Sequence, residues 1–340
     1  MPIRWRHHDG ATRSRPNPWW GLTSSERRDR RRRVRQKSLV WAIKISAPDD
    51  ETSSRWGDTA FAQDLADALE RLGQVVSIHP LGANPTPPSG RYDVVLVLRG
   101  LHRIEPLEGS LDYLWIISHP DAVGADELGA GWNRVFAASM SWDRSAEIGA
   151  QPLLQAASAR RFTPRRDDVD GYDHDVLFVG TSRGIERPVI RDAVTVGADL
   201  TIFGHDWERF APESAIGGDH LPFADVPAAY SSSRIVLNDH WDDMRRCGFL
   251  SNRLFDATFA GARVISDSVP YMSEVFGDLV QTYVDLPDLT ALLTDRDRWP
   301  SGAKRDATIA ELRLHHSFDA RASTLLTSAL EDFRRTRRGR

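Results

Sequence analysis

A helix-opening segment in the second half of the chain carries residues suited to binding an anion. Residues 251–253, Ser-Asn-Arg, follow an apolar run and a polar loop, and they open a helix that closes at Gly261. Ser251 is a favoured N-cap, whose hydroxyl is expected to accept from a backbone N–H of the first turn. A helix N-terminus holds phosphate through free N–H groups and a partial positive charge, and Arg253 adds a cation. Asp256, one turn further, can accept hydrogen bonds from a ribose.

The segment thus predicts a binding site for a nucleotide diphosphate. Asn252 lies one turn before Asp256, on the same side of the helix. The alternative is an ordinary capped helix of an α/β domain, because N-caps of this kind are common. The local pattern leaves both interpretations open.

A glycine-containing loop supplies a second candidate phosphate contact. The sequence FVGTSRGIER follows an apolar run and contains the candidate residues Gly180, Thr181, Ser182, Arg183 and Arg187. It is neither a P-loop nor a complete dinucleotide fingerprint, so alone it is a weak signal. Trp207, after the next apolar run, is expected either to stack on a base or to pack inside the domain.

Polar residues also follow the apolar runs of the first half. Ligands of parallel α/β sheets bind beyond the carboxyl ends of the strands. Trp56, Gly57 and Asp58 come after the first run, Arg99 after a later one and His119 after the next. Arg99 is expected either to contact an anion or to form a structural ion pair. Asp58 and His119 are the candidates for acid or base chemistry, although a helix cap and a structural histidine are the respective alternatives.

Metal and hydrolase signals are weak. The eleven histidines and the single cysteine show no zinc-ligand spacing, and no nucleophile elbow or hydrolase triad is readable. Asp239, Asp242 and Asp243 near His240 allow a cation site, but a solvated loop is the preferred interpretation.

Alternating apolar and amphipathic segments have to position these side chains. Strands are expected at 39–45, 75–78, 94–98, 113–117, 134–138, 176–179, 200–203, 235–237 and 264–265. Helices are expected at 59–72, 189–194, 227–232, 288–294, 301–314 and 319–333. This alternation predicts βαβ units with parallel sheets, in two halves that face each other across a cleft.

Charge is distributed unevenly along the 340 residues. The net charge of −4 combines +9 over residues 1–37, +5 over residues 334–340 and −18 over the body between them. An acidic body argues against a nucleic-acid-binding core. The basic arm, 1–37, is either a solvated tail or a segment that docks on an anionic membrane surface. No apolar run is long enough for a membrane helix and the N-terminus shows no secretory signal, so we expect a cytoplasmic protein, with peripheral attachment to the inner face of the membrane left open.

The second half resembles a known family. The sequence FLSNRLFDATFAGARVISDSVPYMSEVFGD is similar to the donor-binding segment of group-1 glycosyltransferases of the GT-B fold, in particular the CgeB-like, spore-maturation subgroup. FVGTSRGIER, IFGHDWE, YSSSRIVLND and HHSFDARASTLL support the resemblance, as do WGDTAFAQDLADALERLG and LWIISHPD in the first half.

The resemblance implies an α/β architecture of two Rossmann-like domains, with a C-terminal helix crossing back to the first. It implies an arm at 1–37, an acceptor domain at 38–158, a linker at 159–174, a nucleotide-sugar domain at 175–318, and a crossing helix with a basic tail at 319–340. It further implies transfer of a sugar from a nucleotide-diphospho-sugar with retention and without a metal or other cofactor. The acceptor is a glycan, a lipid-linked molecule or a small molecule, and no nucleic acid is expected.

The resemblance also assigns residues. Asp256 stands where relatives contact the ribose, and Gly248 stands where they place an acid against the donor sugar. His119 corresponds to the histidine beside that sugar. Asn238, Phe249 and Leu250 complete the expected donor segment, while Trp56, Gly57 and Arg99 belong to the acceptor side. Relatives also carry a lysine near the diphosphate, and here only Arg183 and Arg187 are available.

Two other functions stay open on the sequence. One is a sugar-nucleotide epimerase or isomerase on the same architecture, which needs acid and base groups facing the sugar. The other is a binding or morphogenetic protein that has kept the fold and lost transfer, an interpretation favoured by Gly248 and the absent lysine.

Overall fold

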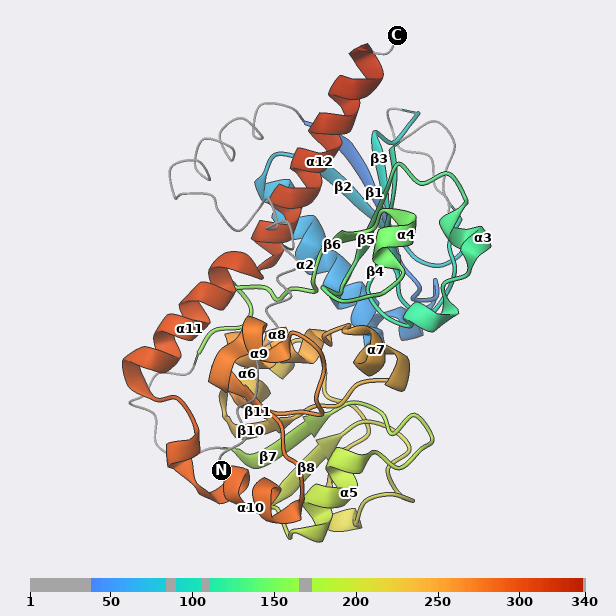
Figure 1. The fold of residues 1–340 in the computed structure, drawn as a ribbon. Helices are drawn as coiled ribbons and strands as arrows, with labels where there is room; N and C mark the ends of the chain where they lie inside the picture. The colour runs from blue at the N-terminus through green and yellow to red at the C-terminus, as the bar shows by residue number, and fades with distance from the viewer. Residues whose placement is uncertain (1–37, 84–89, 106–110, 165–172, 339–340) are drawn as a thin grey trace, which may run out of the picture.

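The computed structural model describes residues 38–83, 90–105, 111–164 and 173–338. The basic arm, part of the predicted linker and the last two residues of the tail lie outside these ranges. Two six-stranded parallel sheets form the framework (Figure 1). No helix of the described residues is long and apolar enough to cross a membrane.

The first sheet has the strand order β2-β1-β3-β4-β5-β6. Its strands are β1 (Val40–Lys44), β2 (Val75–His79), β3 (Val94–Arg99), β4 (Leu111–Ile116), β5 (Arg134–Ala137) and β6 (Gln151–Pro152). Its helices are α2 (Gly57–Arg71), α3 (Ala125–Leu128) and α4 (Ser145–Ile148). β3 and β4 are buried along their whole length, which explains why apolar residues dominate their sequences.

The second sheet has the order β12-β11-β10-β7-β8-β9. Its strands are β7 (His174–Val179), β8 (Leu200–Phe203), β9 (Ile216–Gly218), β10 (Ser233–Leu237), β11 (Arg263–Ile265) and β12 (Val280–Gln281). Its helices are α5 (Pro188–Thr195), α6 (Val226–Ser231), α7 (Asp242–Cys247), α8 (Asn252–Phe259), α9 (Met272–Phe276), α10 (Leu286–Thr294) and α11 (Gly302–His315). Every predicted strand and helix is found, and the parallel pairing is confirmed.

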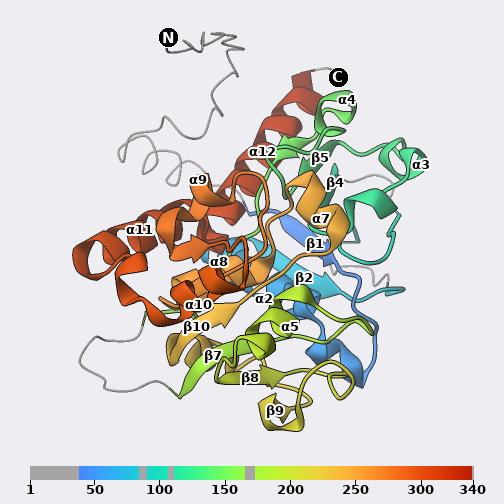
Figure 2. The same cartoon turned by 60° about the horizontal axis from the view of Figure 1, so that its bottom comes forward.

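The last helix, α12 (Phe318–Arg338), runs along the first domain in both views (Figures 1 and 2). Its apolar face, including Phe318 and Leu325, joins the core around α2. Arg134 of β5 pairs with Asp332 at 2.6 Å, and Tyr113 of β4 donates to the same carboxylate. The predicted return of the C-terminal helix to the first domain is confirmed.

The segment from α7 to α8 joins the two domains (Figure 1). Met244, Cys247 and Phe249 are buried in the core on one face of the first sheet. The Ser139 hydroxyl after β5 donates to the carbonyl of Cys247 at 2.6 Å. The sequence predicted only a polar loop before Ser251. α7 forms there because Met244 and Cys247 are buried against the first domain, which local periodicity does not reveal.

Candidate functional site

The strand order creates a topological switch point in each sheet. In the second sheet it lies between β7 and β10, and in the first between β1 and β3. In open α/β sheets, the loops that leave the carboxyl ends of strands at such points bind ligands. The loops after β7 and β10 contain residues 180–187 and 238–241, while Asp58 follows β1 and Gly100 follows β3.

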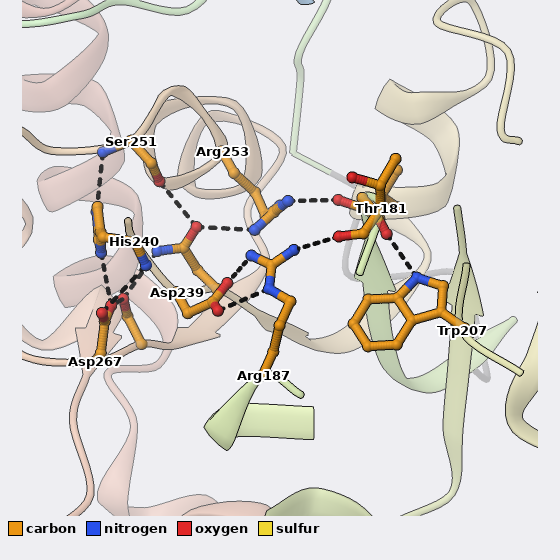
Figure 3. Close-up of polar contacts among 12 residues, drawn as sticks. Thr181, Arg187, Trp207, Asp239, His240, Ser251, Arg253 and Asp267 are labelled. Carbon is orange, nitrogen blue, oxygen red and sulfur yellow. Dashed lines mark hydrogen bonds and ion pairs between the residues drawn. The ribbon is translucent and has the colours of Figure 1, made fainter. Parts of the chain in front are cut away.

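Two arginines are fixed at the second switch point (Figure 3). Arg187 is 1% exposed; its Nε donates to Asp239 Oδ2 at 2.7 Å, its Nη2 to Asp239 Oδ1, and its Nη1 to the Thr181 carbonyl at 2.8 Å. Arg253 reaches over from α8 and donates to Asn238 Oδ1 at 3.0 Å and to the Val179 carbonyl at 2.5 Å. Both guanidinium groups lie 4.5 Å from the centre of the Phe178 ring.

Gly180 makes this convergence possible. Its φ is +154°, and a Cβ there would lie 2.7 Å from Arg253 Nη2 and 3.3 Å from the ring of Phe178. A larger residue would displace the guanidinium group of Arg253. Gly180 is therefore required for the arginines to approach the backbone after β7, which agrees with the phosphate-type loop predicted there.

Positive charge exceeds its local compensation at this point. Arg183 joins the two arginines from the same loop. Burial first, and then the nearby Arg253, lower the pKa of Arg183 to about 10, and the same causes lower the pKa of Arg187. Among the described residues, only Asp239 forms an ion pair with any of the three. An anion placed here relieves the repulsion among these cations.

Asn238 organises the start of α8. This fully buried residue accepts at Oδ1 from the Ser251 hydroxyl at 2.8 Å and from Arg253, and its amide donates to Ser266 at 2.9 Å. The predicted hydrogen bond from the backbone of α8 to the Ser251 side chain is wrong, because that hydroxyl is directed to Asn238. Asn238 positions the site and is too deeply buried to contact a donor itself.

His240 and Asp267 hold the loop before α8 from below (Figure 3). The backbone N–H of Ser251 donates to His240 Nε2 at 3.0 Å, so His240 Nδ1 carries the proton that it donates to Asp267 at 2.6 Å. Burial raises the pKa of Asp267, but the hydrogen bonds from the ring and the backbone N–H of His240 outweigh this effect and lower the pKa overall. Asp239 is 7% exposed and bound to Arg187, so the preferred interpretation of a solvated loop is wrong for Asp239, whereas Asp242 at the start of α7 is exposed. Among the described residues, no group of three or more His, Cys, Asp or Glu is arranged to hold a metal.

Asn252 and Asp256 lie beside these groups on α8. Asn252 Nδ2 donates to Asp256 Oδ2 at 2.7 Å, whereas its buried Oδ1 has no hydrogen-bond partner. Burial raises the pKa of Asp256 well above its usual value, and Asp64 of α2 adds to the rise. Asp256 therefore binds a proton more readily than an exposed aspartate does. An orphaned buried acceptor is rare and marks a place for a donor from a ligand, such as a ribose hydroxyl.

Asp58 of the first domain also has a buried side-chain oxygen without a hydrogen-bond partner. It lies in the first turn of α2, and its Oδ2 is buried without a hydrogen-bond partner. Burial raises the pKa of Asp58 to about 6, while the backbone N–H of Ser46 and the ring of His102 oppose the rise. A Cβ on Gly100 would lie 2.7 Å from this Oδ2, so the carboxylate reaches the end of β3. Trp56 and Gly57 precede it at the start of α2, with Gly57 exposed and Trp56 6.2 Å from the ring of His102.

His119 meets the second domain directly. Its ring lies 5.2 Å from that of Trp241, which follows β10, and the guanidinium group of Arg183 lies 4.1 Å above the same indole. Burial is the main cause that lowers the pKa of His119; Asp243 opposes it, and Arg183 and Arg99 add to it. His119 is therefore neutral near pH 7 and can accept or donate one hydrogen bond.

Arg99 forms a structural ion pair, which is the second of its two expected roles. Its Nε donates to the buried carboxylate of Glu127 at 2.8 Å, and its other two nitrogens donate to the carbonyls of Gly100 and Ala122. The side chain is 3% exposed. Its expected contact with an acceptor is not supported, because the guanidinium group serves to tie β3 to the loop after β4.

Known proteins resemble this chain in sequence over residues 185–327 and in fold over most of its length. Residues 185–327 match a family model described as glycosyl transferase-like. The DNA-modifying enzyme beta-glucosyltransferase, solved with and without uridine diphosphoglucose, is 12% identical and aligns over 86% of this chain and 100% of its own, with a TM-score of 0.53. An alpha-glucosyltransferase bound to UDP and a 13-mer DNA is 10% identical over 87% and 100% of the chains, with a TM-score of 0.56.

A third solved structure has a different described activity. It is a candidate UDP-N-acetylglucosamine 2-epimerase from Listeria monocytogenes, 10% identical over 88% of this chain and 97% of its own, with a TM-score of 0.51. No curated protein sequence matches significantly. The chain has the GT-B fold. The similarity in fold to these proteins extends over 86–88% of the chain.

Three predicted donor contacts of this GT-B chain are corrected. Trp207 is 1% exposed, packs edge-on against Phe178 at 5.5 Å and donates from Nε1 to the Gly180 carbonyl at 2.8 Å. It holds the loop after β7 and cannot stack on a base. Phe249 and Leu250 are 0% and 1% exposed, and Phe249 packs against Trp142 of the first domain. Their side chains anchor α8 and have no access to a donor.

Thr181 and Ser182, in the loop after β7, differ in their exposure to solvent. The Thr181 side chain is exposed beside the arginines, whereas Ser182 is fully buried and its hydroxyl accepts from the N–H of Gly184 at 3.1 Å. Thr181 therefore stays a candidate contact, while Ser182 shapes the loop.

Steric crowding explains why residue 248 is a glycine. Its φ is +73°, and a Cβ there would lie 2.1 Å from Ser141 Oγ and 3.0 Å from Ser139 Oγ. The loop after β5 occupies the space that a side chain at 248 would need. An acid can stand here only if the side chain of Ser141 or the loop after β5 moves.

Gly248→Ala is expected to lower the free energy of unfolding by about 2 kcal/mol, from left-handed backbone strain and the clash with Ser141. Urea denaturation measures the loss. Gly73→Ala is the matched control, because Gly73 has φ +79° and nothing within 4 Å of the added Cβ. An equal loss for the two variants would show that Ser141 does not oppose a side chain at 248.

From the sequence, His240 was named only beside a candidate cation site, and Asp267, Trp241 and Ser141 were missed. His240 and Asp267 follow β10 and β11, so the rule that selects strand ends was able to indicate both of them. Trp241 also follows β10 and was passed over. Ser141 gave no local signal, because only the packing of the two domains brings its buried, unpartnered hydroxyl against Gly248.

Proposed function

We propose that this protein is a glycosyltransferase that moves a sugar from a nucleotide-diphospho-sugar to an acceptor hydroxyl. The observation that carries the proposal is the group of three arginines with a single paired carboxylate at the switch point of the second sheet. The match to a glycosyl transferase-like family model supports it. The neighbours solved with uridine diphosphoglucose or UDP make UDP the first nucleotide to test.

Cleavage of the glycosidic bond leaves negative charge on the nucleotide diphosphate. Arg183 and Arg253, with the exposed Thr181 and the first backbone N–H groups of α8, stabilise that charge as it develops. Arg187 holds the loop and adds its charge from below. Because these groups supply the positive charge, transfer without a metal or other cofactor is part of the proposal. Asn252 and Asp256 receive the ribose through the orphaned Oδ1 and the adjacent carboxyl group.

The first domain supplies the acceptor side. Asp58 accepts the proton of the acceptor hydroxyl, since its Oδ2 is buried and lacks a hydrogen-bond partner. Neutral His119 contacts the sugar or relays a proton. Retention of configuration and membership in the CgeB-like subgroup are proposed from the sequence resemblance alone. We likewise propose a glycan, lipid-linked or small-molecule acceptor, because the acidic body opposes a polyanion, and cytoplasmic action with the basic arm docking on anionic membranes.

A two-stage experiment tests the proposal. Thermal shift with UDP, ADP, GDP and CDP ranks the bases, since a ligand that binds only the folded state raises the melting temperature. The corresponding nucleotide sugars are then incubated with the protein and an acceptor panel, and proton NMR follows the anomeric signals. Transfer with retained configuration is the expected result. Conversion of the donor sugar without transfer would identify an epimerase, and binding without any turnover would identify a binding protein.

Arg253→Met is expected to weaken binding of the preferred nucleoside diphosphate by about 10- to 100-fold, because charged hydrogen bonds of this kind contribute about 1.5–3 kcal/mol. Titration calorimetry measures the affinity. Arg253→Lys keeps the charge but loses the planar fork, so a smaller loss is expected. Unchanged affinity in the Met variant would refute the assignment of the diphosphate to this arginine.

A further inference from the structure

Trp241 lies where the two domains meet, and two strained residues contact it. Among the described residues, four non-glycine residues have a left-handed backbone: His119, Arg183, Asp206 and Tyr271. His119, with φ +51°, and Arg183, with φ +65°, both lie against the indole of Trp241, one from each domain. Such strain persists where the surrounding structure imposes it, often at functional sites.

The three arginines differ in how firmly they are held. Arg187 is fixed by Asp239 and a backbone carbonyl, and Arg253 is fixed by Asn238 and a backbone carbonyl. Within the described ranges, the guanidinium group of Arg183 contacts the face of the Trp241 indole, 4.1 Å from its centre. A cation–π contact holds a guanidinium group in place while leaving its N–H donors available. Among the described residues, Arg183 thus has more N–H donors available to an incoming anion than Arg187 or Arg253.

We propose that Trp241 is a positioning residue. Its indole holds the guanidinium group of Arg183 in place for the diphosphate of the donor, and its contact with His119 connects that placement to the first domain. This rests on the proposed function and deepens it. The indole carries the guanidinium group on its face and the ring of His119 beside it, so the placement of Arg183 depends on the approach of the first domain. Its 36% exposure means that a substitution at Trp241 leaves the core intact.

The test is a double-mutant cycle on nucleoside diphosphate binding. Titration calorimetry with UDP, and with ADP and GDP in parallel, is carried out on the full chain and on Trp241→Leu, Arg183→Met and the double variant. Leucine keeps an apolar side chain and removes the π face. We expect Trp241→Leu to weaken binding about three- to tenfold, and the double variant to bind no more weakly than Arg183→Met alone. Trp241→Phe, which keeps an aromatic face, is expected to bind within about twofold of the wild type.

Two results would overturn the proposal. Additive losses in the double variant would mean that Trp241 contacts the ligand itself or acts elsewhere. Equal losses in the Phe and Leu variants would mean that the π face is irrelevant. The Arg253→Met variant tests the proposed function separately. If Arg253→Met loses affinity for the nucleoside diphosphate while Trp241→Leu does not, the diphosphate site is supported and only the proposed role of Trp241 is refuted.

Discussion

Asp58→Asn is expected to lower the rate of sugar transfer by about 100- to 10 000-fold, the usual contribution of a general base. The amide keeps the size of the side chain and cannot take the proton of the acceptor hydroxyl. Binding of the nucleoside diphosphate should be unchanged, because Asp58 belongs to the first domain. A transfer assay at saturating donor measures the rate, and calorimetry measures the affinity.

The pH dependence of transfer provides a second readout of the same residue. Burial raises the pKa of Asp58 to about 6, and a base acts only when it is ionised. Transfer by the wild type should therefore rise as the pH increases through about 6 and level off above it. Asp49→Asn, an exposed carboxylate of the same loop, is the control and should leave both rate and profile unchanged. A profile that is the same in the wild type and in Asp58→Asn would remove Asp58 from the reaction.

Arg187→Met is expected to lower the free energy of unfolding by about 3–5 kcal/mol, because it leaves Asp239 as an unpaired, buried charge. The pair is closed off from solvent, with side-chain exposures of 1% and 9%. Urea denaturation of the chain measures the loss.

Two further variants isolate the cause. Arg187→Met with Asp239→Leu removes both charges and should recover most of the stability. Arg191→Met removes an arginine of the same region that is 50% exposed and paired with Glu186 and Asp192, and a change of at most about 1 kcal/mol is expected. If Arg187→Met unfolded at the same urea concentration as Arg191→Met, the buried pair would not stabilise the fold.

Much of the fold was predictable because strand and helix periodicities are strong in this chain. The mostly apolar sequences of β3 and β4 are typical of strands buried on both faces. α7 was missed because the reason for its formation is tertiary: Met244 and Cys247 are buried by the first sheet. The short strands β9 and β12 have only three and two residues, so they show no usable alternation.

The candidate site was predicted in its location more than in its contacts. The rule that ligands bind beyond strand ends selected Asp58, Arg183 and Arg187, which follow strands at the two switch points, and His119, which follows β4 and contacts Trp241. It did not distinguish exposed from buried side chains, so it also selected Trp207 and Arg99, which are engaged in internal hydrogen bonds. The hydroxyl of Ser251 shows the same limit, because a buried Asn238 outcompetes the helix backbone for it.

The most direct test of the central claim is a crystal structure of the protein with the nucleoside diphosphate that gives the largest thermal shift. We predict that the diphosphate lies between the loop after β7 and the start of α8, within hydrogen-bond distance of Arg183 and Arg253, with the ribose toward Asn252 and Asp256. A diphosphate bound elsewhere, or one with no contact to either arginine, would contradict the account.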